Sequence, residues 1–173
     1  DWEKFEMWAN TVPYTLCNPL YHWTHMELRR PFGVRDTLLD ATTAHAIYDH
    51  CNAKLAQDDF RTQGLLRQFQ VLVVCTTDDP VDTLEAHQRY AKSASAATKL
   101  FPAWRPDKAM AVSDLPAWNL WVDRLQEVAN LEIDTFETLL AALQRRHDFF
   151  HQMGCRLSDH GLEQVWAEPY TAR

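Results

Sequence analysis

The apolar segment FQVLVVC, at residues 69–75, constrains the fold of this chain more than any other feature. A continuous apolar, β-branched run of this length is typical of a strand buried on both faces of a sheet. The residues before it carry helical patterns, which predict helices over 2–11, 19–30 and 42–56. We therefore expect a helical subdomain over residues 1–68 and a sheet-forming segment over residues 69–173.

The sheet-forming segment alternates strand and helix patterns. Asp79 followed by Pro80 predicts the start of a helix, with Asp79 as its N-cap. The elements predicted after it are a strand over 100–104, helices over about 114–130 and 135–152, and a short strand over 155–161. Asp134 and Glu137 suggest a capping box for the last helix, and Gly154 its stop. This alternation indicates an α/β fold with a parallel sheet wrapped by helices.

Polar residues follow each predicted strand. They are TTDD at 76–79, WRPD at 104–107 and SDH at 158–160. In parallel α/β sheets the carboxyl ends of the strands lie at one edge, where ligands bind. We therefore expect the functional site at this edge.

Three side chains at this edge are the candidate site residues. Arg105 presents a planar guanidinium that can bind a carboxylate through two hydrogen bonds. Asp159 can orient a substrate hydroxyl or take part in proton transfer, and His160 is a third candidate for substrate binding. Asp78 and Asp79 could bind a cation, although Asp79 also has a structural role as a predicted cap.

The histidine pairs do not predict a metal site. His22 and His25 share a helix face, but no third ligand lies near them in the sequence, and a catalytic zinc needs three protein ligands. His147 and His151 have the spacing of HExxH, but HDFFH lacks the glutamate. We interpret both pairs as parts of packed or solvated helix faces.

Composition excludes several classes of function. The net charge is −7 with no basic stripe, which argues against nucleic-acid binding. The four cysteines are far apart, so neither a zinc ribbon nor a disulfide framework is indicated. No apolar run is long enough to span a membrane, and no signal peptide is visible. These features predict a soluble, cytoplasmic protein without a membrane or nucleic-acid partner.

Four segments together resemble the uronate isomerase (glucuronate isomerase) family of the amidohydrolase superfamily. They are NPLYHWTHMELRRPFG (18–33), VVCTTDDPVDTLEAH (73–87), FPAWRPDKA (101–109) and GCRLSDHG (154–161). The resemblance covers nearly the whole chain in the right order. It implies part of a (β/α)8 barrel, about strands two to four, with residues 1–68 as a helical insertion.

The resemblance also implies an activity and two site residues. The family interconverts D-glucuronate with D-fructuronate and D-galacturonate with D-tagaturonate, an aldose–ketose isomerisation. Arg105 and Asp159 match family positions that face the active site, although Ala103 and Trp104 depart from the pattern before the arginine. We therefore expect Asp159 to be catalytic and substrate-binding, with Arg105 and His160 also binding substrate.

The resemblance further implies that this chain is an internal piece of a longer enzyme. The superfamily's H-x-H metal pair is absent from the sequence, so a divalent metal such as zinc would be held by residues of the complete enzyme outside this chain. We expect the 173-residue chain alone to be inactive and to self-associate, or to form a homo-oligomer. Two alternatives stay open: a helical sugar-binding module built on exposed tryptophans, and a hydrolase of the same superfamily.

Overall fold

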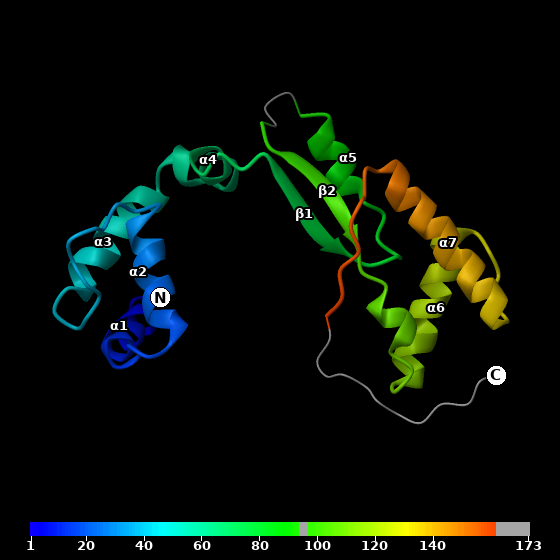
Figure 1. The fold of residues 1–173 in the computed structure, drawn as a ribbon, viewed down its shortest axis with the longest axis horizontal. Helices are drawn as coiled ribbons and strands as arrows, with labels where there is room; N and C mark the ends of the chain where they lie inside the picture. Colours follow the sequence, from blue (N-terminus) through cyan, green and yellow to red (C-terminus); the bar gives the residue numbers. More distant parts are fainter. Residues whose placement is uncertain (94–96, 162–173) are drawn as a thin grey trace. The chain divides into compact units, whose positions relative to one another are not determined.

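The computed structural model describes residues 1–93 and 97–161 of the chain (Figure 1). The chain divides into two compact units, residues 1–71 and 72–173. The regular elements of the first unit are all helices, joined by loops. Its elements are α1 (Trp2–Thr11), the 3-10 turn η1 (Val12–Tyr14), α2 (Pro19–Arg29), α3 (Ala44–Leu55), the 3-10 turn η2 (Asp58–Phe60) and α4 (Thr62–Gln68).

Local sequence explains where α2 begins, and a small apolar core holds the unit together. The side chain of Asn18 accepts a hydrogen bond from the backbone N–H of Leu20, and Pro19 occupies the first helical position. The buried core residues come from α1, η1, α2, α3 and the loop before α3: Ala9, Val12, Leu28, Leu39, Ala44, Ile47 and Cys51. Burial of these apolar side chains, which four helical elements and one loop contribute, provides the main stabilisation of the unit.

The second unit is built on a two-stranded parallel sheet. Strand β1 (Val73–Asp78) pairs with β2 (Lys99–Trp104), with Val73 opposite Lys99 and Asp78 opposite Trp104. Helix α5 (Glu85–Ala91) connects the two strands, and the 3-10 turn η3 (Asp107–Met110), α6 (Leu115–Ala129) and α7 (Phe136–Gln152) follow β2. The structure is thus of mixed α/β class, with the predicted parallel pairing.

Helices α5 and α7 cover one face of this sheet (Figure 1). Thr76 contacts His87 of α5, and Trp104 packs edge-on against Phe150 of α7. Thr76 and Trp104 point to the same side, because Trp104 lies opposite Asp78, two residues after Thr76. On the other face, Val73, Cys75 and Thr77 are exposed.

The prediction of a strand at 69–75, buried on both faces, was wrong in two respects. Phe69 is the C-cap of α4, and the strand begins only at Val73. Exposed and half-buried residues then alternate along the strand to Asp78, because the described helices cover only one face of the sheet. Leu72, just before the strand, is 77% exposed.

The predicted N-cap role of Asp79 was also wrong. Helix α5 begins six residues later, after Leu84, whose φ is 57°. The Asp79 carboxylate instead accepts a hydrogen bond from the N–H of Val81, and the Asp79 N–H donates to the carboxylate of Asp82. These local bonds close a turn at Pro80 and therefore compete with helix formation there.

The predictions for the last three elements were closer. Asp114 caps α6, but the capping box of α7 consists of Thr135 and Thr138 instead of Asp134 and Glu137. Gly154 follows α7 with a φ of 93°, a conformation that favours glycine. The predicted strand at 155–161 is reduced to one parallel bridge, between Trp104 and Ser158.

Two further expectations concern the cysteines and membrane-spanning helices. All four cysteines are free thiols, with Cys17 and Cys75 exposed. Within the described part of the chain, no helix combines the length and apolar character needed to cross a membrane.

Candidate active site at the carboxyl edge of the sheet

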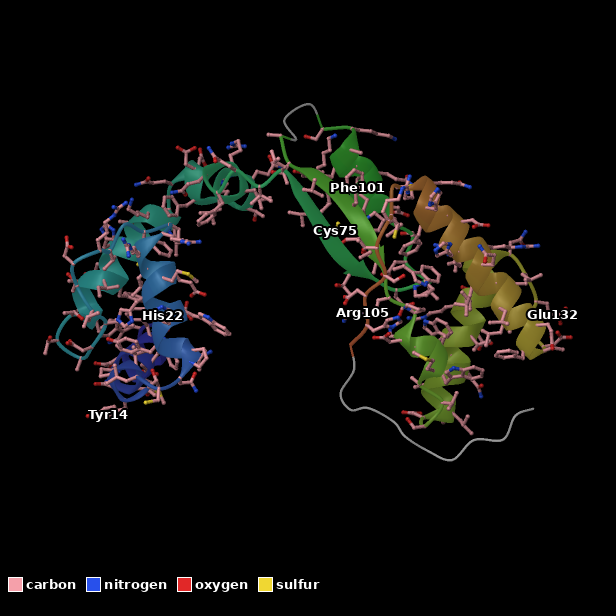
Figure 2. The ribbon with its side chains drawn as sticks, in the orientation of Figure 1. Tyr14, His22, Cys75, Phe101, Arg105 and Glu132 are labelled. Carbon is pink, nitrogen blue, oxygen red and sulfur yellow. The ribbon has the colours of Figure 1, made fainter. Side chains whose placement is uncertain are left out.

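Side chains from three chain segments meet where β1 and β2 end. Arg105 Nη2 donates a hydrogen bond to Asp159 Oδ2, and Thr77 Oγ1 donates to the same oxygen at 3.1 Å. Figure 2 shows Arg105 near the carboxyl ends of the two strands. The backbone fixes these positions, because the Arg105 N–H donates to the Asp78 carbonyl and the Asp159 N–H to the Trp104 carbonyl. Parallel pairing thus joins residues that are 82 positions apart, Thr77 and Asp159.

The pair is accessible and charged. The side chain of Arg105 is 37% exposed and that of Asp159 is 40% exposed, so a ligand can reach both. The hydrogen bond from Arg105, aided by that from Thr77, lowers the pKa of Asp159 below its usual 3.8. Asp159 is therefore a carboxylate at neutral pH and a weak proton acceptor, which suits it to orienting Arg105 and substrate hydroxyls.

Arg105 has one buried donor without a partner. Its Nε atom is buried and has no hydrogen-bond partner among the described residues. A buried donor without a partner costs free energy, so such a group needs an explanation. A ligand oxygen beside the guanidinium would satisfy this donor.

His160 is held by Asp107, a residue that sequence reasoning did not select. The His160 Nδ1 atom lies 2.6 Å from Asp107 Oδ1, and the Gly161 N–H donates to Asp107 Oδ2 at 2.6 Å. Both bonds lower the pKa of Asp107, and the bond from the Gly161 N–H has the larger effect. Asp107 and His160 are 53 positions apart, and the only sequence signal for the pair was that both follow predicted strands.

A cavity of about 340 Å³ opens beside these groups. The residues that line it are Thr77, Asp78, Asp79, Asp82, Arg105, Asp107 and Lys108. Lys108 Nζ pairs with Asp79 Oδ2 at 3.0 Å, and Asp79 also accepts a hydrogen bond from the Trp121 indole. Four aspartates and two cations line this hollow, so its lining is net negative, and Arg105 and Lys108 are the groups in it that could bind a carboxylate.

The histidine pairs have structural partners. His25 Nδ1 lies 2.8 Å from the Tyr21 carbonyl, and His25 Nε2 accepts a hydrogen bond from the Leu39 N–H at 3.0 Å. His147 lies edge-on to the Trp104 ring. Across residues 1–93 and 97–161, no three His, Cys, Asp or Glu side chains lie close enough together to hold a metal ion. The described residues therefore do not fit the divalent metal that the family resemblance implies.

The tryptophans do not form a stacking surface in the described ranges. Trp23 alone among them is exposed there, whereas Trp104 and Trp121 are buried. A sugar-binding module needs exposed, neighbouring aromatic faces. The described tryptophans therefore do not support a sugar-binding module built on exposed aromatic faces.

Comparison with known proteins gives a consistent result. A profile of the glucuronate isomerase family matches residues 1–172. The uronate isomerases of Cellvibrio japonicus and Bacteroides thetaiotaomicron are 55% and 53% identical over 171 residues, which are 99% of this chain and 36% of each relative. The chain thus spans about a third of the length of these curated relatives.

Solved structures agree with the sequence comparison. The crystal structure of uronate isomerase from Thermotoga maritima matches with a TM-score of 0.83 at 36% identity, covering 92% of this chain and 34% of that one. Glucuronate isomerase from Caulobacter crescentus matches with a TM-score of 0.82 at 25% identity, covering 92% of this chain and 33% of that one. The match of the family profile over nearly the whole sequence shows that this chain belongs to the glucuronate isomerase family.

Proposed function

We propose that the protein to which this chain belongs interconverts hexuronate aldoses and ketoses, D-glucuronate with D-fructuronate and D-galacturonate with D-tagaturonate. Membership of the family supports this activity, and so do the uronate isomerase names of the relatives. The observation in the chain itself is the pair of Arg105 and Asp159 at the carboxyl edge of the sheet, with a free Nε donor on Arg105.

The reaction moves one proton from C2 to C1 and one from the C2 hydroxyl to the C1 oxygen, and it changes no net oxidation state. A base removes the proton from C2 of the open-chain aldose, an enediol-like intermediate forms, and a proton returns at C1. Arg105 binds the substrate carboxylate, or the oxygen on which negative charge develops, through its planar guanidinium. Asp159 holds that guanidinium in place and accepts a hydrogen bond from a substrate hydroxyl. His160 binds a second polar group of the sugar. The lowered pKa of Asp159 makes it a weak base, so another group removes the C2 proton.

We further propose that β1, β2 and the segment at Ser158 are three successive strands of a (β/α)8 barrel, about strands two to four. Their parallel order and the helices on one face support this arrangement. A barrel of this type needs roughly 250 residues, more than this chain provides. In the complete barrel the exposed face of Val73, Cys75 and Thr77 would point inward. The divalent metal of the family would then be bound by residues of the complete enzyme outside the described part of this chain.

The test uses the intact protein and follows the C2 proton. D-glucuronate and D-galacturonate are incubated with the protein in D₂O, and proton NMR records loss of the C2 signal and appearance of the ketose. Arg105→Lys keeps the charge but loses the planar fork, so kcat/KM should fall at least about tenfold, equivalent to roughly 1.4 kcal/mol.

The matched control is Arg124→Lys, an exposed position on α6 away from the sheet edge. Its kinetics should equal those of the unchanged protein, and neither variant should shift the melting temperature appreciably. Hydrolysis of a lactone or amide without ketose formation would instead identify a hydrolase of the same superfamily. Unchanged kinetics in Arg105→Lys would remove Arg105 from the site.

A further inference from the structure

A second cavity, of about 570 Å³, lies in the helical unit and is distinct from the sheet edge. Its walls come from α2 and the loop that follows it. The lining residues are His22, His25, Met26, Arg29, Arg30, Val34, Arg35, Thr37 and Leu38. Three of them are arginines and none is acidic, in a protein whose net charge is −7. Figure 2 shows His22 on α2, within this unit.

The three arginines lack internal counter-ions. Arg29, Arg30 and Arg35 form no ion pair and no side-chain hydrogen bond with any residue in the described ranges. Arg29 and Arg30 also lie at the C-terminal end of α2, where a cation is favoured by the helix dipole. That effect accounts for a positive charge at the helix end, but it does not account for Arg35, which comes from the loop. Three like charges around one hollow repel one another, and an anion bound between them would relieve this repulsion.

Hydrogen bonds fix the two walls of the cavity relative to each other. The Gly33 N–H donates to the Arg29 carbonyl at 3.2 Å, and the Val34 N–H donates to the Leu28 carbonyl at 3.1 Å. Gly33 has a φ of 77°, which lets the chain turn back immediately after the helix. The spacing between Arg29 and Arg35 is therefore set before any ligand arrives.

His25 ties the far end of the loop to α2. Because the Leu39 N–H donates to Nε2, the Tyr21 carbonyl must accept from Nδ1–H, so the ring is the neutral Nδ1–H tautomer. Leu39 is only 1% exposed and belongs to the core of the unit, which anchors the loop further. Met26, Val34 and Leu38 add apolar surface beside the cations.

We propose that this cavity binds a small oxyanion, a phosphate or carboxylate group held by Arg29, Arg30 and Arg35. The guanidinium fork matches either group through paired N–H donors. The proposal goes beyond isomerase activity and does not depend on it, since it concerns residues of the helical unit alone.

Calorimetric titration of the intact protein at low ionic strength tests the proposal, with inorganic phosphate and D-glucuronate as separate probes. At least one probe should bind saturably, and Arg29→Gln and Arg35→Gln should each weaken that binding at least about fivefold. Added salt should weaken it as well. Competition between the two probes would show that phosphate and carboxylate use the same cavity.

Arg67→Gln is the matched control, because Arg67 is an exposed arginine of the same unit that does not line the cavity. An equal loss in this variant would reduce the effect to general charge attraction and overturn the proposal. So would the absence of saturable binding by either probe. If Arg105→Lys weakens glucuronate binding and neither Arg29→Gln nor Arg35→Gln does, glucuronate binds at the sheet edge and not in this cavity. That result would also overturn the proposal. Circular dichroism of each variant verifies that the helices are retained.

Discussion

Asp159 is the residue whose role the geometry defines most narrowly. It accepts hydrogen bonds from both Arg105 and Thr77, and these bonds lower its pKa. A carboxylate with a lowered pKa is a poor general base near neutral pH, because efficient bases have pKa values close to the working pH. Its contribution should therefore come through position and charge, with proton transfer assigned to another group.

The variant Asp159→Asn separates these roles. The amide keeps the size but removes the charge that holds Arg105, so kcat/KM should fall at least about tenfold. The acid limb of the pH–rate profile between pH 5 and 7 should stay in place, because Asp159 titrates below this range. Asp123→Asn, at an exposed position on α6, is the control. Loss of the acid limb in Asp159→Asn would show that Asp159 is the base after all.

At the scale of elements, local signals predicted best where the determinants are local. The helices near 114–130 and 135–152 begin at capping residues and end at Asn130 or near Gly154, all within a few positions in sequence. The strand at 69–75 was misplaced because its burial depends on which distant elements cover the sheet. The turn at Asp79 was missed because side-chain bonds compete with a helix start there.

The site follows the same rule. Arg105 and Asp159 could be selected from the sequence because polar residues after parallel strands share one edge. The bond between Asp107 and His160 could not, since it joins positions 53 residues apart and no local pattern encodes it. Strand order alone gives proximity, whereas the partner of each side chain depends on rotamers set by packing.

The cap of α7 gives a test at this scale. Thr135 accepts a hydrogen bond from the Thr138 N–H, and the Thr138 hydroxyl accepts one from the Thr135 N–H. Thr135→Ala should therefore lower the free energy of unfolding by about 1 kcal/mol, measured by urea denaturation. Glu137→Ala, which removes the side chain expected from sequence to complete the box, should lower it by less than Thr135→Ala does. A larger loss of stability in the Glu137 variant than in Thr135→Ala would show that Asp134 and Glu137 form the capping box instead.

For the molecule as a whole, both units carry carboxylates that the fold stabilises. In the helical unit, hydrogen bonds from Thr42 lower the pKa of Asp40, and the bond from the Thr42 hydroxyl has the largest effect. In the other unit, the pKa values of Asp107 and Asp159 are also lowered. Each unfolded carboxyl binds a proton near its usual 3.8, above the value in the fold, so the unfolded state takes up more protons in acid. The stabilisation is complete above about pH 4 and is lost as the pH falls through the lowered values.

Urea unfolding at a series of pH values measures this dependence. The free energy of unfolding should change little between pH 7 and 5 on account of these three groups and decrease below about pH 4. Asp40→Ala should flatten the acid decrease of the helical unit and leave that of the sheet unit in place. A sheet unit that loses its acid decrease in the same variant would contradict the assignment of Asp40 to the helical unit alone.

The exposed sheet face has the largest consequence for how the 173-residue chain behaves by itself. Val73 is 49% exposed and Leu72 is 77% exposed, and β1 has a hydrogen-bonded neighbour on one side only among the described residues. Apolar surface and an unpaired strand edge both favour association with another chain. We therefore expect the isolated chain to self-associate and to show no uronate turnover, even with added zinc or manganese.

Sedimentation velocity at several concentrations measures the self-association, and Val73→Lys should shift the distribution toward monomer by placing a charge on the exposed face. Leu140→Lys is the control for added charge, because Leu140 is an exposed residue of α7 and does not belong to this strand. A monodisperse monomer that binds no apolar dye would show that the face needs no partner, and turnover of glucuronate by this chain would show that it holds a complete active site.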